Sequence, residues 1–103
     1  MSNDNQKYLS SSQQRVLNTL KALFGHEITG VTSKELAQRL GTSASQVFKD
    51  LMNLQEAGIA EQLPNKNWRI SAGLGREAIK ILNHINEGRQ RVEEVSNRYT
   101  RTN

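Results

Sequence analysis

The sequence predicts a mainly α-helical fold with a small β-hairpin, followed by a long C-terminal helix. Three observations lead to this prediction. Two helix starts follow each other closely between residues 31 and 46, and strand-like alternation flanks a turn at residues 64–67. A heptad-like apolar repeat then extends from about residue 76 to residue 99.

The composition limits the class of protein. The 103 residues suffice for one small domain with an appendage, and only 35 % of them are apolar. A net charge of +4 favours a polyanionic partner over an acidic one. The absence of cysteine excludes a disulfide framework and a thiolate zinc site. With no apolar signal region at the start and no run of membrane-spanning length, we expect a cytoplasmic protein.

The first helix is predicted after a polar lead-in. Residues 1–9 are polar and aperiodic, and we expect them to be disordered. The segment Ser10–Gln14 offers several N-cap residues, and Gly25 is expected to end the helix. We expect Ile28, in the link that follows, to enter the core. The apolar stripe of this helix consists of Val16, Leu17, Leu20, Leu23 and Phe24.

Two short capped helices joined by a tight turn are predicted in the centre of the chain. Thr32 and Glu35 form a capping box, and Ser43 and Gln46 form a second one. Gly41 between them can adopt the left-handed conformation that closes the first of these helices. This arrangement is that of a helix-turn-helix, which makes double-stranded DNA the leading candidate partner.

A β-hairpin is predicted directly after the helix-turn-helix. Ile59, Glu61 and Leu63 alternate with other residue types, as Trp68 and Ile70 do after the turn. Trp68 is expected to fill the core between hairpin and helix. A hairpin in this position is a wing, so residues 10–73 are predicted to form a winged helix-turn-helix domain.

The C-terminal segment is predicted to be a separate helix. Gly73 and Gly75 are expected to interrupt the chain, and residues 74–103 to form a helix with a frayed end. Its apolar seam suggests a homodimer through Ile81, Ile85, Val92 and Val95. The alternative is a single amphipathic helix that packs back on the domain.

The outward face of the third helix is the predicted recognition surface. At about 100° per residue, Val47, Leu51 and Leu54 share one side and face the core. Gln46 is suited to pair with adenine, and Lys49 is suited to guanine or a phosphate. The full set of predicted DNA-binding residues is Ser33, Thr42, Ser43, Ser45, Gln46, Lys49, Asn53, Lys66 and Arg69.

Each of these assignments has a structural alternative. Gln46 can serve only in its capping box, and Lys49 can be an ordinary solvated charge. Phe48 is expected to pack under the first helix or the wing. Asp50 and Glu56 would repel phosphates, so the C-terminal half of this helix is expected to leave the groove.

The segment from Gln14 to Leu74 resembles the DNA-binding domain of IclR-type transcriptional regulators. The matching elements are Arg15 to Leu23, Glu35 to Gly41, Ser45 to Gly58 and the step Trp68-Arg69-Ile70. The resemblance implies a regulator, of bacterial or phage type, that binds duplex DNA as a dimer. It also implies major-groove positions for Thr42, Ser43, Ser45, Gln46 and Lys49, and a wing position for Lys66.

The sequence departs from the IclR pattern at several points. Only a polar helix follows the wing, where IclR-type regulators carry a large effector-binding domain. Phe48 occupies a position that is usually polar, and Asp50 adds an acid to the recognition helix.

The remaining chemistry argues against an enzyme. His26 and His84 have no partner at metal-ligand spacing, and no Gly-rich phosphate loop or nucleophile elbow is present. We therefore expect no catalytic residue, no cofactor and no metal.

A protein-interaction adaptor is the alternative to a DNA-binding regulator. Residues 1–72 contain eight Lys and Arg against six Asp and Glu, a small basic excess for a DNA-binding protein. Binding to single-stranded nucleic acid or RNA is the third possibility, and the scarcity of exposed aromatic residues argues against it.

Overall fold

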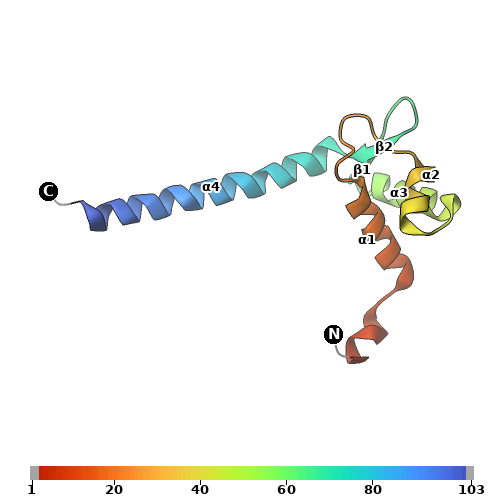
Figure 1. Cartoon of the computed structure of the whole chain (residues 1–103), viewed down its shortest axis with the longest axis horizontal. Coiled ribbons are helices and arrows are strands. Elements are labelled where there is room, and N and C mark those ends of the chain that lie inside the picture. The colour runs from red at the N-terminus through yellow and green to blue at the C-terminus, as the bar shows by residue number, and fades with distance from the viewer. Residues whose placement is uncertain (1–2, 102–103) are drawn as a thin grey trace.

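A 3-10 helix, three short α-helices, a two-stranded hairpin and a long terminal helix follow one another along the described part of the chain (Figure 1). The computed structural model describes residues 3–101. The predicted mainly α fold with a small hairpin and a long C-terminal helix is confirmed. Its elements are η1 (Asn3–Tyr8), α1 (Ser11–Leu23), α2 (Ser33–Leu40), α3 (Ala44–Glu56), β1 (Ala60–Gln62), β2 (Trp68–Ile70) and α4 (Ala72–Thr100).

Hydroxyl side chains begin each of the α-helices. Ser10, Thr32, Ser43 and Ser71 are the N-caps of α1 to α4, and each side chain accepts a hydrogen bond from the N–H group three residues later. The two caps predicted in the centre of the chain are therefore confirmed. Gly41 ends α2 with φ of 67°, the left-handed conformation that the turn before α3 requires.

The core lies between α1, α2, α3 and the hairpin. The predicted core face of α3, Val47, Leu51 and Leu54, is buried. Trp68 is the largest buried side chain, with 1 % of its surface exposed, which confirms its predicted place between wing and helix. The other buried apolar residues are Leu23, Val31, Leu36, Ala37, Ala60 and Ile70.

Two apolar predictions for the first part of the chain were wrong. Leu17 and Phe24 are about half exposed, because α1 turns Thr19 to the core together with Leu23, whose predicted burial is confirmed. Ile28 is 88 % exposed and does not enter the core. Its loop is held against the wing by main-chain and side-chain bonds, and these leave Ile28 facing outward.

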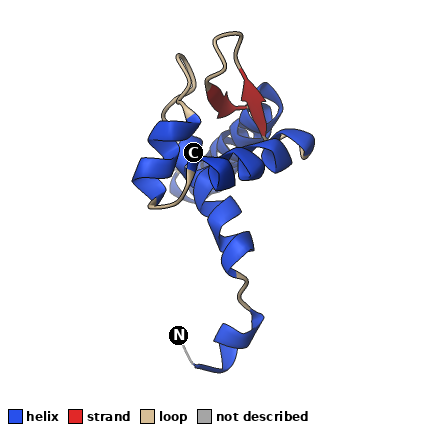
Figure 2. Ribbon diagram, turned by 90° about the vertical axis from the view of Figure 1, so that its right-hand side faces the viewer, coloured by secondary structure: helices blue, strands red, loops and turns tan. Residues whose placement is uncertain are grey.

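The wing is bonded to the loop that joins α1 and α2. β1 and β2 are antiparallel, with Ala60 opposite Ile70 and Gln62 opposite Trp68. Val31 adds a bridge to Trp68, with N–O distances of 2.9 and 2.8 Å. The Nδ2 group of Asn67 also donates to the carbonyl of Thr29 at 3.1 Å. Hairpin and loop therefore project side by side from the domain (Figure 2).

Gly30 is required where this loop meets the wing. Its φ is 75°, and a Cβ atom there would lie 2.8 Å from both Asn67 Cβ and Leu63 Cδ1. We expect Gly30→Ala to lower the free energy of unfolding by about 3 kcal/mol. Gly25→Ala is the matched control. Gly25 also has a positive φ, of 96°, but a Cβ atom there would have no neighbour within 4 Å. Denaturant unfolding should show a loss of only about 1 kcal/mol for Gly25→Ala, and equal losses would contradict the close contact at Gly30.

Both ends of the chain differ from the sequence-based expectation. Residues 3–8 form the 3-10 helix η1 rather than an irregular lead-in, while residues 1–2 and the predicted frayed end at 102–103 lie outside the described part.

Gly73 and Gly75 do not interrupt the chain, since Ser71 caps α4 ahead of both glycines. The predicted domain boundary at residue 73 therefore lies inside α4.

The long helix α4 extends away from the domain. Leu74 still packs against the core, but every described side chain from Arg76 onward is exposed. The radius of gyration is 20.0 Å, compared with about 13 Å for a compact domain of this size. Helix α4 thus does not pack back on the domain.

None of the helices in the described part is both long and apolar enough to cross a membrane.

Candidate nucleic-acid interface

The first two turns of α3 form an exposed polar surface. Ser45, Gln46 and Lys49 are all exposed there, as the helical angles predict. Ser43 caps the helix by accepting from the main-chain N–H of Gln46 at 3.2 Å, and its hydroxyl lies 3.2 Å from that of Ser45. The paired hydroxyls stand beside the free N–H groups of the first helical turn, which favour an anion.

The main chain of Gln46 bonds to the N-cap Ser43, but its side chain has a different partner. The hydroxyl of Thr42 donates a hydrogen bond to its Oε1 atom. This contact fixes the amide at the turn between α2 and α3 and leaves its NH2 group free to donate. The Gln46 side chain therefore bonds to Thr42 instead of completing the predicted capping box with the Ser43 N–H, and it keeps an amide donor.

Lys49 is the cation of this surface. It is exposed, one turn beyond Ser45, and the structure gives its ammonium group no hydrogen bond or ion pair among the described residues. Asn53 lies one turn further, where its Nδ2 group donates to the carbonyl of Lys49 at 2.8 Å. One amide donor of Asn53 is therefore used within its own helix, although the residue is exposed.

The wing tip presents a second cation. Lys66 has a left-handed backbone, with φ of 73°, and its side chain is exposed. Gln62 Nε2 donates to the Lys66 carbonyl at 3.1 Å, and the N–H of Asn67 donates to Asn65 Oδ1 at 3.0 Å. These bonds hold the tip in one shape, with the Lys66 side chain left to solvent.

Arg69 was predicted to bind DNA, but the structure gives it an internal role. Its two terminal nitrogens bond to the carbonyl of Glu27 and to the carboxylate of Glu61, each at 3.2 Å. The other oxygen of Glu61 accepts from the N–H of Ala72 at 2.8 Å. Arg69 and Glu61 therefore connect the wing to the start of α4.

A further set of bonds fixes the direction of α4 at this junction. The hydroxyl of Ser71 donates to the carbonyl of Gly58 at 2.6 Å. The N–H of Ser71 donates to the carbonyl of Ile59 at 2.8 Å. Bonds on both the main chain and the side chain of one residue make this a stiff connection between wing and helix.

The sequence suggested that Asp50 would repel phosphates, but its carboxylate is not part of the exposed face of α3. Asp50 is 2 % exposed and forms a bidentate ion pair with Arg15 of α1, with distances of 2.7 and 3.1 Å. Its side-chain hydrogen bonds and its charge raise the pKa of the Arg15 guanidinium. Sequence reasoning missed this pair, because the helical period cannot show a partner 35 residues away.

Phe48 packs against the wing, as predicted. Its ring meets the edge of Trp68, with centroids 6.3 Å apart and planes at 79°. The ring is nevertheless 48 % exposed, so an apolar edge remains between α3 and the hairpin.

The predicted residues thus divide into two groups. The exposed set consists of Ser43, Ser45, Gln46, Lys49, Asn53 and Lys66, whereas Ser33 and Thr42 are partly buried. Arg69 and the amide nitrogen of Asn53 are bonded within the protein. Within residues 3–101, no group of three or more His, Asp or Glu side chains is placed to hold a metal ion.

This domain is similar to a winged helix of known structure. The Zα domain of the ORF112 protein of Cyprinid Herpesvirus 3, from a structure on its binding mode to Z-DNA, superposes with a TM-score of 0.52. Sequence identity is 25 %, and the match covers 60 % of this chain and 97 % of that one. No protein-family model and no curated protein sequence matches the chain. The fold is a winged helix with an added C-terminal helix, and the IclR-type assignment stays a prediction.

Proposed function

We propose that this protein binds double-stranded DNA and regulates transcription. In the proposed complex, the first turns of α3 enter the major groove and the wing lies on the adjacent backbone or minor groove. The proposed direct contacts are Ser43, Ser45, Gln46, Lys49 and Lys66. No catalytic step and no cofactor are part of this proposal, and we place the protein in the cytoplasm.

One observation carries the proposal: hydroxyl, amide and ammonium groups gather on the outward face of the first turns of α3, whereas Asp50, one of its two acids, is buried and the other, Glu56, is its last residue. The major groove of B-form DNA is wide enough to admit an α-helix. The phosphates along its edges are bound by hydrogen-bond donors and cations of the protein. The burial of Asp50 against Arg15 removes one of the two negative charges of α3 that would oppose such an approach, and the other, Glu56, lies at the far end of the helix. The similar Zα domain, described with Z-DNA, supports a DNA partner for this fold.

We also propose that the protein acts as a homodimer through α4. The seam residues Ile81, Ile85, Val92 and Val95 are all exposed along the free helix. An isolated helix is marginal in water and is usually stabilised by packing of an apolar face. A dimer would double the number of DNA contacts and so raise affinity.

Reversal of the charge at Lys49 tests the recognition face. We expect Lys49→Glu to weaken binding to a random-sequence duplex about tenfold at low salt, since it replaces a phosphate partner by an acid. Fluorescence anisotropy of labelled DNA is the measurement. Lys21→Glu is the matched control, because it makes the same charge change on the exposed side of α1. Equal losses in both variants would indicate a general charge effect and contradict a specific role for α3.

The form of the duplex is tested in the same assay. A duplex of alternating dC and dG, chemically locked in the left-handed form, is compared with the random B-form duplex. Tighter binding to the B-form duplex supports insertion of α3 into the major groove. Preference for the left-handed duplex would contradict that placement while retaining DNA as the partner.

A further inference from the structure

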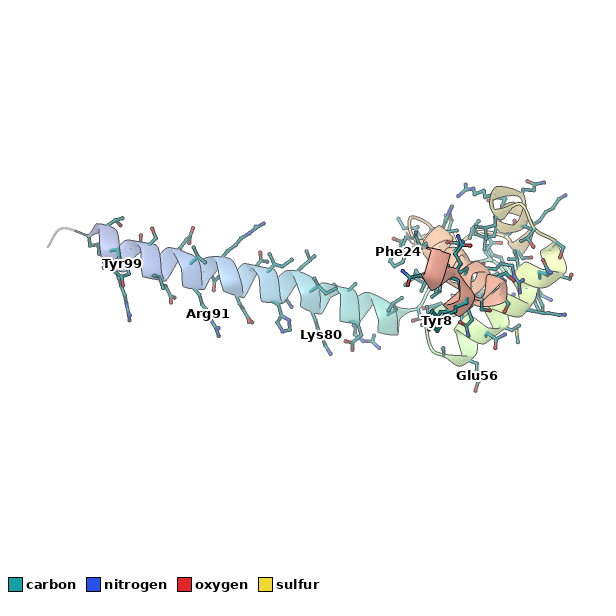
Figure 3. The ribbon with its side chains drawn as sticks, turned by 90° about the horizontal axis from the view of Figure 1, so that it is seen from below. Tyr8, Phe24, Glu56, Lys80, Arg91 and Tyr99 are labelled. Atoms are coloured by element: carbon teal, nitrogen blue, oxygen red, sulfur yellow. The ribbon has the colours of Figure 1, made fainter. Side chains whose placement is uncertain are left out.

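Helix α4 carries an apolar face that nothing in its own domain covers. The seam residues from Ile81 to Tyr99 are 47 to 87 % exposed. Figure 3 shows the side chains of this helix, among them Lys80, Arg91 and Tyr99, in open space away from the domain. The junction at Ser71 and Glu61 sets the direction in which the helix leaves the domain, and this direction carries the apolar face away from the core.

We infer that the face is covered by α4 of a second copy that runs in the opposite direction. This inference rests on the dimer proposed above and assigns its orientation. A two-fold axis between Ile85 and Gly88 places each of these residues opposite the other in the second copy. Counting outward from this axis then places Ile81 opposite Val92, and Ala78 opposite Val95.

The sizes of the seam residues favour this orientation. In the antiparallel pair, each layer joins a larger residue to a smaller one, so the two helices stay at an even distance. Gly88 leaves a hollow beside Val92, and an added Cβ there would meet no atom within 4 Å. Ile85 of the second copy would fill this hollow. A parallel pair would instead set Gly88 against Gly88 and Ala78 against Ala78, and both layers would be underpacked.

The charges beside the seam favour the same orientation. One flank of the seam carries Glu77, His84, Arg91 and Arg98, and the other carries Gly75, Leu82, Arg89 and Ser96. In an antiparallel pair, each flank faces the same flank of the second copy, which runs in the opposite direction. Glu77 of each copy then meets Arg98 of the other, once at each end of the pair. His84 then lies beside Arg91, which gives no opposite charge. Parallel helices bring the two flanks together, and Glu77 then faces Leu82 instead of a cation.

The orientation decides where the two DNA-binding domains lie. With 29 residues, α4 is about 43 Å long at 1.5 Å per residue. Antiparallel pairing places the domains at opposite ends of this rod, whereas parallel pairing would place both at one end. The distance between the two DNA segments that one dimer can contact follows from this difference.

Cysteine cross-linking of the full chain tests the orientation, because the protein has no cysteine of its own. We expect an equal mixture of Ala78→Cys and Val95→Cys chains to form a disulfide-linked heterodimer in a glutathione buffer. Each variant alone should stay unlinked, since two copies of residue 78 would be about 25 Å apart in the antiparallel pair. Asn83→Cys, on the outer side of the helix, is the matched control that should stay unlinked in the mixture and alone.

Other outcomes would overturn the inference in distinguishable ways. Self-linked Ala78→Cys dimers would show parallel helices, with the proposed dimer still standing. A monomeric mass of the unmodified chain at high concentration in analytical ultracentrifugation would remove the dimer as well. Neither outcome bears on DNA binding through α3, which the anisotropy titration measures separately.

A charge exchange provides a second test. Glu77 also pairs with Lys80 within the helix, at 3.0 Å, so a loss in Glu77→Arg alone does not identify its partner. We expect Glu77→Arg and Arg98→Glu each to weaken the dimer about tenfold, and the double variant to restore it. A double variant no better than the single ones would contradict the antiparallel pair.

Discussion

Replacing Arg15 by methionine is expected to lower the melting temperature by about 10 °C. The change leaves the carboxylate of Asp50 in the core without its cation, and Asp50 is 2 % exposed. A buried charge without a partner is strongly destabilising, whereas an apolar pair of similar volume can be as stable as the ion pair. The pair also positions α3 on α1, so its loss should disturb the helix that carries the proposed DNA contacts. Thermal unfolding followed by circular dichroism measures the effect.

A double-mutant cycle separates this pair from a general effect of charge. The double variant Arg15→Met/Asp50→Leu should recover most of the lost stability, because no unpaired charge remains. Lys21→Met is the matched control, since it removes an exposed cation from the same helix and should change the melting temperature little. If Arg15→Met behaves like Lys21→Met, the ion pair does not stabilise the domain.

Local patterns in the sequence were sufficient to predict most of the fold. The N-caps at Thr32 and Ser43 and the left-handed glycine at residue 41 depend on residues three to nine positions apart. The core face of α3 follows from the helical period alone. The place of Trp68 follows from its size in a strand beside a helix, and the structure agrees.

Contacts between distant segments could not be predicted in this way. Arg15 meets Asp50 across 35 residues, and Arg69 meets the carbonyl of Glu27 across 42. These two contacts give Arg69 a role inside the protein and bury Asp50 with a cation of its own. The exposure of Ile28 likewise depends on hydrogen bonds between its loop and the wing, which no local pattern contains.

The glycines near the start of α4 show a different limit. Gly73 and Gly75 are poor helix formers, and propensity alone predicts a break. The cap at Ser71 and the bond from the Ala72 N–H to Glu61 satisfy the first free groups of the helix. Tertiary bonds therefore outweigh the local preference, and the helix continues through both glycines.

Salt dependence of duplex binding tests the central claim that α3 and the wing meet DNA phosphates. Titration of the unmodified protein against a random-sequence duplex, at salt concentrations between 50 and 200 mM, is the one measurement to make. With about three phosphate contacts for each protein, the association constant should fall about 50-fold over this range. The slope should decrease by about one when Lys49 or Lys66 is replaced by glutamine. Absence of binding at low salt, or binding that does not change with salt, would contradict the claim.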